Sequence, residues 1–559
     1  MKHWPLAVLV LLVAVPAALQ ARQPIYARHA MVVAQEDHAA DVGLKILQSG
    51  GNAVDAAVAI GFALAVTHPY AGNIGGGGFM LVRMADGRRS FIDFRERAPA
   101  KATPDMYLDS HGSPTKDSIV GWRAVGVPGT VRGLELAHNR YGSKPWAALL
   151  QPAIHLATTG IPVSHWQMES WNHSAELLSQ FPDSKRIFLK EGAFYGWHET
   201  FRQPELARTL QRIAGEGSRG FYEGETAHLL ADAMHKNGGL ITLADLRDYR
   251  ALERTPLEGD YKGYHVITAP PPSSGGVGLL QMMGMLDGTD YEKAGAGSAE
   301  SYHYLAEVMR RFFADRSEFL GDPDFVRNPI SSLLDQKYIE ARRATINPAH
   351  ATSSDQINPG IKHSREGTDT THYDVVDEHG NIAAVTYTLN AGYGSGVTVP
   401  GAGFLLNDEM DDFSAKPGAS NMFGLVQGER NAIAPGKRPL SSMMPTIVLK
   451  DGKPFLVLGA PGGSTIISAV LQVILNVVDF HMNVQDAVNF SRIHHQWRPD
   501  KLLVERGISP DTIALLKQMG YVIDEAHPVV LARVEAVEMS DGWLQGGHDD
   551  RGPGKAVGY

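Results

Sequence analysis

Apolar residues recur at helical spacing in several stretches of the N-terminal part of the chain. Residues 37–49 (DHAADVGLKILQS) carry apolar side chains on one face, and Gly50-Gly51 ends the predicted helix. Residues 53–66 (AVDAAVAIGFALAV) are apolar nearly all round, which predicts a buried helix ending at His68-Pro69. The same spacing predicts further helices over residues 145–158, 203–214 and 299–319.

Strand patterns become frequent in the C-terminal part. HYDVVD (372–377) and IAAVTYTL (382–389) flank a turn-rich EHGN and predict a β-hairpin. TIVLKDGKPFLVLGA (446–460) predicts a second hairpin with Asp451-Gly452 as its turn. An apolar helix over 464–479 and a helix beginning at Ser509-Pro510-Asp511 follow. Strand pairs inside and helices outside predict a layered α/β fold.

Two polar segments interrupt these patterns. APPPSSGG (269–276) is expected to form a rigid surface loop without chemistry. Residues 350–368 are rich in Gly, Pro and Ser and predict a flexible linker, which runs directly into Asp369-Thr370 at the mouth of the first hairpin.

Composition restricts the chemistry. Of 559 residues, 43% are hydrophobic and the formal charge is −10, which predicts a soluble globular protein and disfavours nucleic-acid binding. The chain contains no cysteine, so disulfides, a cysteine nucleophile and thiolate metal sites are excluded. Covalent catalysis would therefore use oxygen or nitrogen.

The first 21 residues (MKHWPLAVLVLLVAVPAALQA) have the layout of a signal peptide: a basic start, a short apolar core and small residues at the exit. The rival interpretation is a membrane anchor, but the apolar run is shorter than the ~20 residues that span a bilayer. No other segment is long and apolar enough to span. The expected location is periplasmic or secreted.

Gly462 and Gly463 stand between a predicted buried strand and the start of the apolar helix. Their N–H groups and the helix dipole suit an oxyanion hole, although a plain strand-to-helix turn has the same pattern. LLNDEMDDF (405–413) is either an exposed acidic turn or a site where carboxylates capture a cationic amine. Its spacing does not fit an EF-hand calcium loop.

Two further stretches carry candidate substrate-binding groups. Arg95 closes a predicted strand and could bind a carboxylate through two hydrogen bonds, or form a surface ion pair. Ser441-Ser442 lies in a Pro-flanked loop that could offer hydroxyl donors, or be an ordinary loop. His494-His495 lacks the partners of a metal motif, so a structural role is expected and no metal is predicted.

Several longer motifs carry a family resemblance. Between about residue 25 and Tyr559 the chain resembles γ-glutamyltranspeptidases of the N-terminal-nucleophile hydrolase superfamily. The motifs are FRERAPAKA, TTHYDVVDEHGNIAAVTYTLN, LLNDEMDDFSAKPG, KRPLSSMMPTIV, LGAPGGS and DDRGPGKAVGY. The resemblance implies a four-layer αββα sandwich, with two stacked sheets and helices outside.

The resemblance also implies that the precursor cuts itself between Asp369 and Thr370. Residues 22–369 would form a large subunit that contributes the substrate arginine, and residues 370–559 a small catalytic subunit, the two remaining together as a heterodimer. Thr370 would then be the nucleophile. Its new α-amine, with an unperturbed pKa of about 7.7–8.0, could accept the hydroxyl proton.

The other implied roles follow the family motifs. Thr388 would orient Thr370, and Gly462 and Gly463 would supply the oxyanion N–H groups. The α-carboxylate of the substrate would be held by Arg95, Ser441 and Ser442, and its α-ammonium by Asn390, Glu409 and Asp412. The implied substrates are glutathione and other γ-glutamyl compounds, with water, amino acids or dipeptides as acceptors and no cofactor.

Two positions depart from the pattern of many bacterial relatives. Phe423 stands where a lid over residues 416–428 often carries tyrosine, and Glu409 where some relatives have glutamine. Two alternatives remain open: an acylase of the same fold acting on glutaryl amides such as cephalosporin side chains, and a non-catalytic periplasmic binder of glutamate-like ligands.

Overall fold

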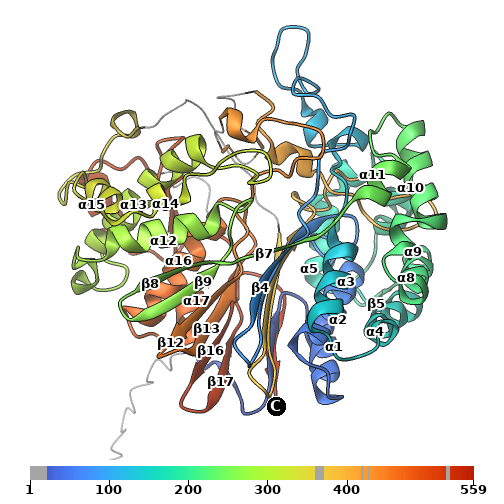
Figure 1. Ribbon diagram of the computed structural model, residues 1–559, viewed down its shortest axis with the longest axis horizontal. Coiled ribbons are helices and arrows are strands. Elements are labelled where there is room, and N and C mark those ends of the chain that lie inside the picture. Colours follow the sequence, from blue (N-terminus) through green and yellow to red (C-terminus); the bar gives the residue numbers. More distant parts are fainter. Residues whose placement is uncertain (1–21, 359–369, 417–420, 423, 426–427, 524–528) are drawn as a thin grey trace, which may run out of the picture.

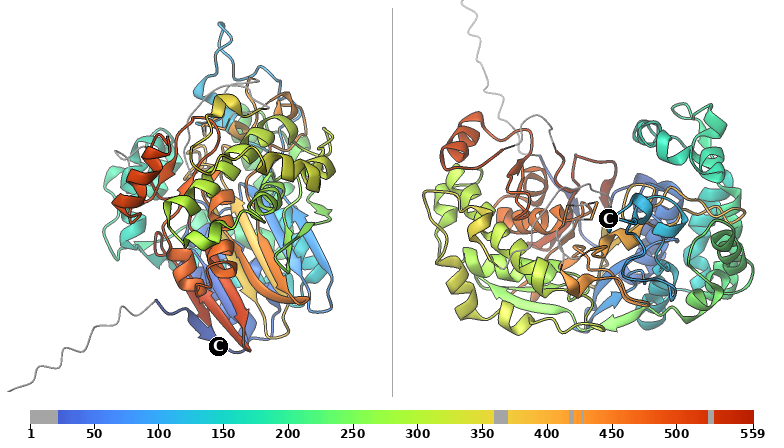
Figure 2. Two further views of the ribbon diagram at one scale, coloured as in Figure 1. Left: turned by 90° about the vertical axis from the view of Figure 1, so that its left-hand side faces the viewer. Right: turned by 90° about the horizontal axis from the view of Figure 1, so that it is seen from above.

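Two large antiparallel sheets are stacked face to face and covered by helices on both outer sides (Figure 1). The computed structural model describes residues 22–358, 370–416, 421–422, 424–425, 428–523 and 529–559. Seen from above, the two helical groups lie on opposite sides of the sheets (Figure 2). The predicted four-layer sandwich is therefore confirmed.

The strand order places segments from both ends of the chain side by side. One sheet has the order β1 (Ile25–Ala27), β17 (Trp543–Gly547), β16 (Glu535–Ser540), β13 (Lys453–Gly459), β12 (Thr446–Lys450), β9 (Tyr264–Thr268) and β8 (Leu257–Tyr261). The other has the order β18 (Lys555–Gly558), β2 (Met31–Ala34), β10 (Thr371–Val376), β11 (Ile382–Thr388), β3 (Gly77–Arg83), β4 (Arg89–Asp93) and β7 (Leu252–Arg254). Two-residue pairs outside these sheets join β5 (Ile161–Pro162) to β6 (Thr200–Phe201) and β14 (Ile493–His494) to β15 (Leu503–Val504).

The helices divide between the two outer layers. On the side of β10 and β11 lie α1 (Asp37–Gln48), α2 (Ala53–Thr67), α3 (Thr130–Tyr141) and α4 (Trp146–Thr159), followed outward by α5 (His165–His173), α6 (Ala175–Leu178), α7 (Pro182–Phe188), α8 (Pro204–Glu216), α9 (Arg219–Tyr222), α10 (Gly224–Lys236) and α11 (Leu243–Asp248). On the side of β12 and β13 lie α12 (Gly275–Leu286), α13 (Ala299–Phe319), α14 (Ile330–Leu333), α15 (Gln336–Arg343), α16 (Thr465–Val478), α17 (Val484–Asn489) and α18 (Pro510–Gln518). Among the described residues, no helix combines the length and apolar character needed to cross a bilayer.

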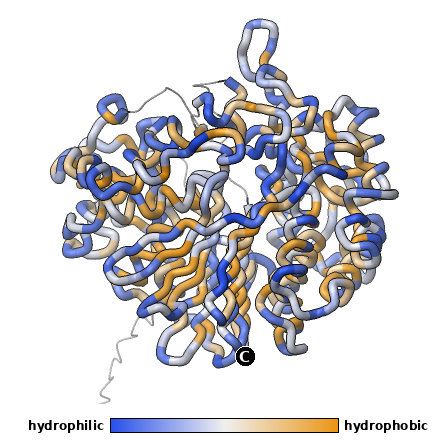
Figure 3. Tube along the Cα trace, viewed as in Figure 1, coloured by the Kyte–Doolittle hydropathy of each residue, from blue (hydrophilic) through white to orange (hydrophobic). Residues whose placement is uncertain are grey.

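Alternation along the strands separates two apolar cores. Val376 belongs to the core between the sheets, while its neighbour Val375 packs in the core beneath α2. Successive strand residues point to opposite faces, so Asp374 and His372 share the inner face with Val376. The strands and the helices that cover them are the most apolar parts of the chain (Figure 3). Both predicted hairpins form, β10 with β11 and β12 with β13.

The sheets approach closely where Gly459 of β13 faces His372 of β10. A Cβ at Gly459 would lie 2.3 Å from Cε1 of the His372 ring. That ring cannot move aside freely, because it is buried and hydrogen-bonded to Thr386 Oγ1 at 2.8 Å and to Asp374 Oδ1 at 3.0 Å. Glycine at this position is therefore required by packing.

We expect Gly459→Ala to destabilise the protein by about 1–3 kcal/mol through overpacking. Gly215→Ala in α8 is the matched control, since no atom lies within 4 Å of its new Cβ; it should stabilise by up to about 1 kcal/mol by removing a helical glycine. Thermal unfolding midpoints compare the two variants. Equal midpoints would show that the sheets can separate to admit a methyl group.

Candidate active site

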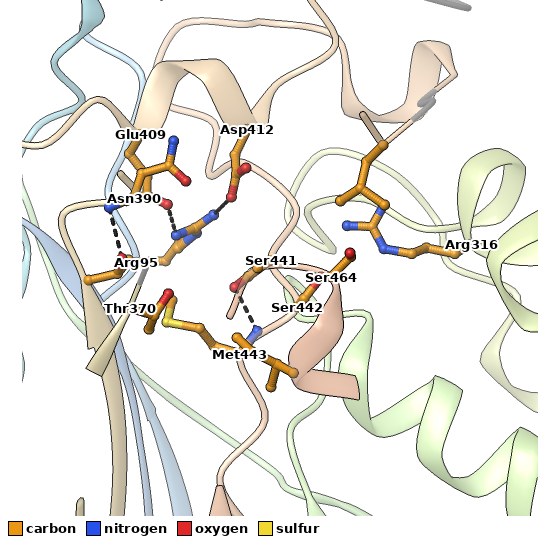
Figure 4. Close-up of a pocket in the computed structure, with 14 residues that line it drawn as sticks. Arg95, Arg316, Thr370, Asn390, Glu409, Asp412, Ser441, Ser442, Met443 and Ser464 are labelled. Atoms are coloured by element: carbon orange, nitrogen blue, oxygen red, sulfur yellow. Dashed lines mark hydrogen bonds and ion pairs between the residues drawn. The ribbon is translucent and has the colours of Figure 1, made fainter. Parts of the chain in front are cut away.

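A pocket lies at the end of the β10–β11 hairpin, where loops from both halves of the chain meet (Figure 4). It contains about 320 Å³ of empty space, part of it open to solvent. Nine of the residues that the sequence marked for chemistry line it: Arg95, Thr370, Thr388, Asn390, Glu409, Asp412, Ser441, Ser442 and Gly463. These residues come from six separate stretches of sequence, so the fold brings them together.

Thr370 and Thr388 stand at the same end of the hairpin. Thr370 directly precedes β10 and is 5% exposed, and Thr388 is the last residue of β11. Because Thr371 pairs with Tyr387, the same antiparallel register sets Thr370 opposite Thr388. The Thr388 hydroxyl accepts a hydrogen bond from the Asn390 N–H at 2.8 Å, and Asn390 turns the chain with a φ of 81°.

Arg95 is held from several sides, two residues beyond β4. Its N–H donates to Asp93 Oδ1 at 3.0 Å, and its Nε donates to the carbonyl of Pro439 at 3.2 Å. The two terminal nitrogens reach different carboxylates, one on Glu409 and one on Asp412. The side chain is only 1% exposed, so the surface ion pair considered from the sequence is wrong.

The acidic segment is buried. Asp408, Glu409 and Asp411 are almost inaccessible, and residues 409–412 form the 3₁₀ turn η6 (Glu409–Asp412). Asp411 accepts from Ser118 Oγ at 2.7 Å and from the Met422 N–H at 2.6 Å. The alternative of an exposed acidic turn is therefore wrong.

The carboxylates around Arg95 outnumber it. Burial raises the pKa of Glu409 well above its ordinary value, although Arg95 opposes this. Burial likewise raises the pKa of Asp412, and raises that of Glu96, whose carboxylate lies 3.6 Å from Arg95, to about 7. Within the described part of the chain, Glu409 Oε2 and both oxygens of Glu96 have no hydrogen-bond partner. One arginine therefore faces three carboxyl groups in this buried cluster, and the charged form of each depends on a nearby cation.

The loop of Ser441 is fixed by the segment 269–276. The Ser441 N–H donates to the Pro272 carbonyl at 2.8 Å, and the Ser441 carbonyl accepts from both the N–H and the hydroxyl of Ser274 at 2.8 Å. The Ser441 hydroxyl accepts from the Met443 N–H at 3.1 Å. Ser273 and Ser274 are fully buried, so the expected surface loop is wrong: the segment is an internal support for the pocket.

Gly462 and Gly463 precede α16 in positive-φ conformations of 136° and 56°. A Cβ at Gly462 would lie 2.6 Å from Thr465 Oγ1 and 2.9 Å from Cα of Ala532, which requires glycine there. Among the described residues, neither glycine N–H donates a hydrogen bond to a backbone carbonyl. Gly463 lines the pocket, whereas Gly462, the residue before it in the chain, is not among the lining residues.

The sequence model of the gamma-glutamyltranspeptidase family matches residues 39–559. The chain belongs to the γ-glutamyltranspeptidase family.

Three similar proteins illustrate the range of this γ-glutamyltranspeptidase family and its neighbours. A glutathione hydrolase proenzyme from Pseudomonas sp. (strain A14) is 50% identical over 509 residues, covering 90% of this chain and 88% of that protein. The crystal structure of Helicobacter pylori gamma-glutamyltranspeptidase is 44% identical with a TM-score of 0.57, covering 59% of this chain and 95% of that one. A cephalosporin acylase from Bacillus halodurans has a TM-score of 0.84 at 27% identity, covering 96% of this chain and 97% of that one.

Five residues that line the γ-glutamyltranspeptidase pocket were not predicted from the sequence: Arg316, Leu425, Met443, Ser464 and Ile466. Met443 and Ser464 adjoin predicted residues, so proximity to the motifs could have indicated them. Arg316 lies within the long helix α13, far in sequence from the family motifs. The sequence offers no signal for Arg316 as a pocket residue; only the structure shows that α13 is almost wholly buried.

Some predicted positions cannot be placed. Asp369, Phe423 and the signal segment 1–21 lie outside the described residues, as do residues 359–368 of the predicted linker. The described start of that linker is anchored, with the Ser354 hydroxyl donating to the Trp497 carbonyl at 2.6 Å. His494 and His495 are buried, and burial lowers the pKa of each to about 4.

Proposed function

We propose that this chain is a self-processing γ-glutamyl transferase and hydrolase, which transfers the γ-glutamyl group of glutathione and related compounds through a Thr370 ester. Water, or the amine of an amino acid or dipeptide, would then take up the acyl group. The main support for this proposal is the arrangement of one buried arginine, Arg95, beside the carboxylates of Glu409 and Asp412.

A γ-glutamyl substrate supplies what that cluster lacks. Its α-ammonium would be bound by Glu409, Asp412 and the amide oxygen of Asn390, and its α-carboxylate by Arg95 with the hydroxyls of Ser441 and Ser442. A buried carboxylate oxygen without a partner is costly, so a cation that reaches Glu409 Oε2 gains a charge-assisted hydrogen bond. The zwitterion adds one charge of each sign and leaves the net charge of the site unchanged.

The free amine of a cut chain makes Thr370 reactive. In the first step Thr370 Oγ attacks the γ-carbonyl carbon, its hydroxyl proton passes to its own α-amine, and the amide C–N bond breaks as the departing amine takes that proton. In the second step water or an acceptor amine attacks the ester carbonyl carbon. The ester C–O bond then breaks and Thr370 Oγ recovers a proton through the same α-amine.

The oxyanion formed in both steps needs donors that are already oriented. The N–H groups of Gly462 and Gly463 would meet this need, because they precede the N-terminus of α16 and, among the described residues, donate no hydrogen bond to a backbone carbonyl. Thr388, opposite Thr370 in the hairpin register, would hold the nucleophile in position.

Cleavage between Asp369 and Thr370 would divide the chain into residues 22–369 and 370–559. The match to Helicobacter pylori γ-glutamyltranspeptidase supports such a division, since 95% of that chain corresponds to only 59% of this one. Both pieces contribute strands to the β10-containing sheet, which favours a stable heterodimer after the cut. We further propose that residues 1–21 export the precursor and are removed.

The sequence left two alternative functions, an acylase for glutaryl amides and a non-catalytic binder of glutamate-like ligands. The fold also fits the cephalosporin acylase, but a glutaryl chain lacks the ammonium and would leave Glu409 and Asp412 without a new cation at a desolvation cost. A non-catalytic binder of glutamate-like ligands would use the same charges yet would not need Thr370 at a new N-terminus.

One experiment separates these functions. Purified protein should show two bands on a denaturing gel, and N-terminal sequencing of the smaller piece should read Thr-Thr-His-Tyr from Thr370. The same preparation should release p-nitroaniline from γ-glutamyl-p-nitroanilide and leave the glutaryl analogue nearly untouched. A single unbroken chain without turnover would support the binder, and preference for the glutaryl compound would support the acylase.

A further inference from the structure

A second arginine lines the pocket on the side away from Arg95. Arg316 of α13 is 2% exposed, and in Figure 4 it lies across the pocket from Arg95, beside Ser464 and Ser442. Its Nε donates to Ser274 Oγ at 2.9 Å, and Ser274 in turn donates to the Ser441 carbonyl at 2.8 Å. The guanidinium is thus tied to the same internal support that fixes the substrate-binding serines.

We propose that Arg316 binds the carboxylate of the amine component, both the peptide released from a donor such as glutathione and the amino acid or dipeptide that attacks the ester. This inference rests on the proposed function and assigns the acceptor end of the same pocket. It makes Arg316 a residue that determines specificity for acceptors with a free carboxylate.

The expected position of the amine component follows from the position of the γ-glutamyl group in the pocket. The α-end of the γ-glutamyl group occupies the Arg95 side, and its γ-carbonyl must reach Thr370 and Gly463. The amine component therefore extends away from Arg95, toward the side of the pocket where Arg316 and Ser464 lie (Figure 4). Leu425 and Ile466 add apolar side chains to the lining of the same pocket. Transfer to an amine is the reverse of donor cleavage, so the leaving and entering amines use one subsite.

The charge of Arg316 acts within the pocket. It is one of the groups that oppose the burial-driven rise in the pKa of Asp412, so the two side chains interact electrostatically. A buried guanidinium is weakly hydrated and presents a planar fork of donors, which matches a carboxylate better than an ammonium does. Hydrogen bonds of this charged type in a poorly solvated site give strong discrimination against a neutral isostere.

The test compares two acceptors that differ only at the distant end, glycylglycine and glycylglycinamide, with γ-glutamyl-p-nitroanilide as donor. In the wild-type enzyme we expect kcat/KM for transfer to favour glycylglycine by about tenfold or more. In Arg316→Gln the preference for glycylglycine should fall to about threefold or less. Arg316→Lys should retain part of the preference because the positive charge remains. A wild-type enzyme that treats both acceptors alike would overturn the proposal without any variant.

Two controls separate binding from structure. Arg88→Gln changes an exposed arginine that pairs with Asp86 on the surface, so it should keep the wild-type ratio. If Arg316→Gln slows both acceptors by the same factor, Arg316 only supports the fold and the proposal is wrong. If Arg316→Gln does not mature, the proposal is still tested by the ratio of kcat/KM for glycylglycine to that for glycylglycinamide, measured in Arg316→Lys and in the wild type. Absence of p-nitroaniline release by the wild type would instead refute the proposed function itself.

Discussion

Thr370→Ala should give a precursor that remains one chain and has no measurable turnover. In the proposed mechanism the substitution removes the oxygen that would attack both the Asp369 carbonyl and the γ-glutamyl carbonyl, and without the cut no α-amine would be available as base. Removal of the nucleophile from a comparable hydrolase lowers kcat about 10⁶-fold, so the residual rate should not exceed that of the uncatalysed reaction by a measurable amount. A denaturing gel and release of p-nitroaniline from γ-glutamyl-p-nitroanilide measure the two effects.

The neighbouring threonine provides the matched control. Thr371 points to the opposite face of β10, where its hydroxyl donates to Gln35 Oε1 at 3.3 Å, so Thr371→Ala should still be cut and should still turn over substrate. Thr370→Ser keeps a hydroxyl and an amine and should mature with reduced activity. Cleavage of the Thr370→Ala precursor at the same bond would assign the attack to another group.

The elements that could be predicted from the sequence are those whose pattern is local. The β10–β11 hairpin shows alternation and a turn signal, and α2 and α16 are continuous apolar runs bounded by capping residues or glycine. In each case the residues that decide the structure are within one turn or one strand of one another. The structure reproduces these elements almost to the residue.

The environments of the same residues could not be predicted, because burial of polar side chains depends on tertiary contacts. From composition alone, Arg95 and the acidic segment around Glu409 are expected at the surface. Both are buried because the positive charge of Arg95 and the negative charge of Glu409 compensate each other, although the two residues are 314 positions apart in the sequence. Residues 269–276 have the composition of a loop and are buried because Ser441 pairs with them. The family motifs indicated nine of the residues that line the pocket, whereas Arg316 could be placed there only from the fold.

Arg95 is the site where we expect the second large effect, since its proposed role in substrate binding is combined with compensation of buried charge. Arg95→Lys should raise KM for γ-glutamyl donors by about 10- to 100-fold, equivalent to about 1.4–2.8 kcal/mol. A lysine keeps the charge but cannot contact Glu409 and Asp412 with separate nitrogens while holding a carboxylate. Steady-state kinetics with γ-glutamyl-p-nitroanilide give KM and kcat separately.

Arg95→Gln removes the charge as well and should affect the fold. Glu96, Glu409 and Asp412 would lose their shared cation, and breaking a buried ion pair from one side costs about 3–5 kcal/mol. Part of this loss should be recovered in Arg95→Gln combined with Glu409→Gln, because one unpaired carboxylate is then neutral. The double variant should therefore unfold at a higher temperature than Arg95→Gln alone, while its KM stays high. If Arg95→Lys left KM unchanged, the α-carboxylate would have to bind elsewhere, and the assignment of Arg95 to substrate binding would be wrong.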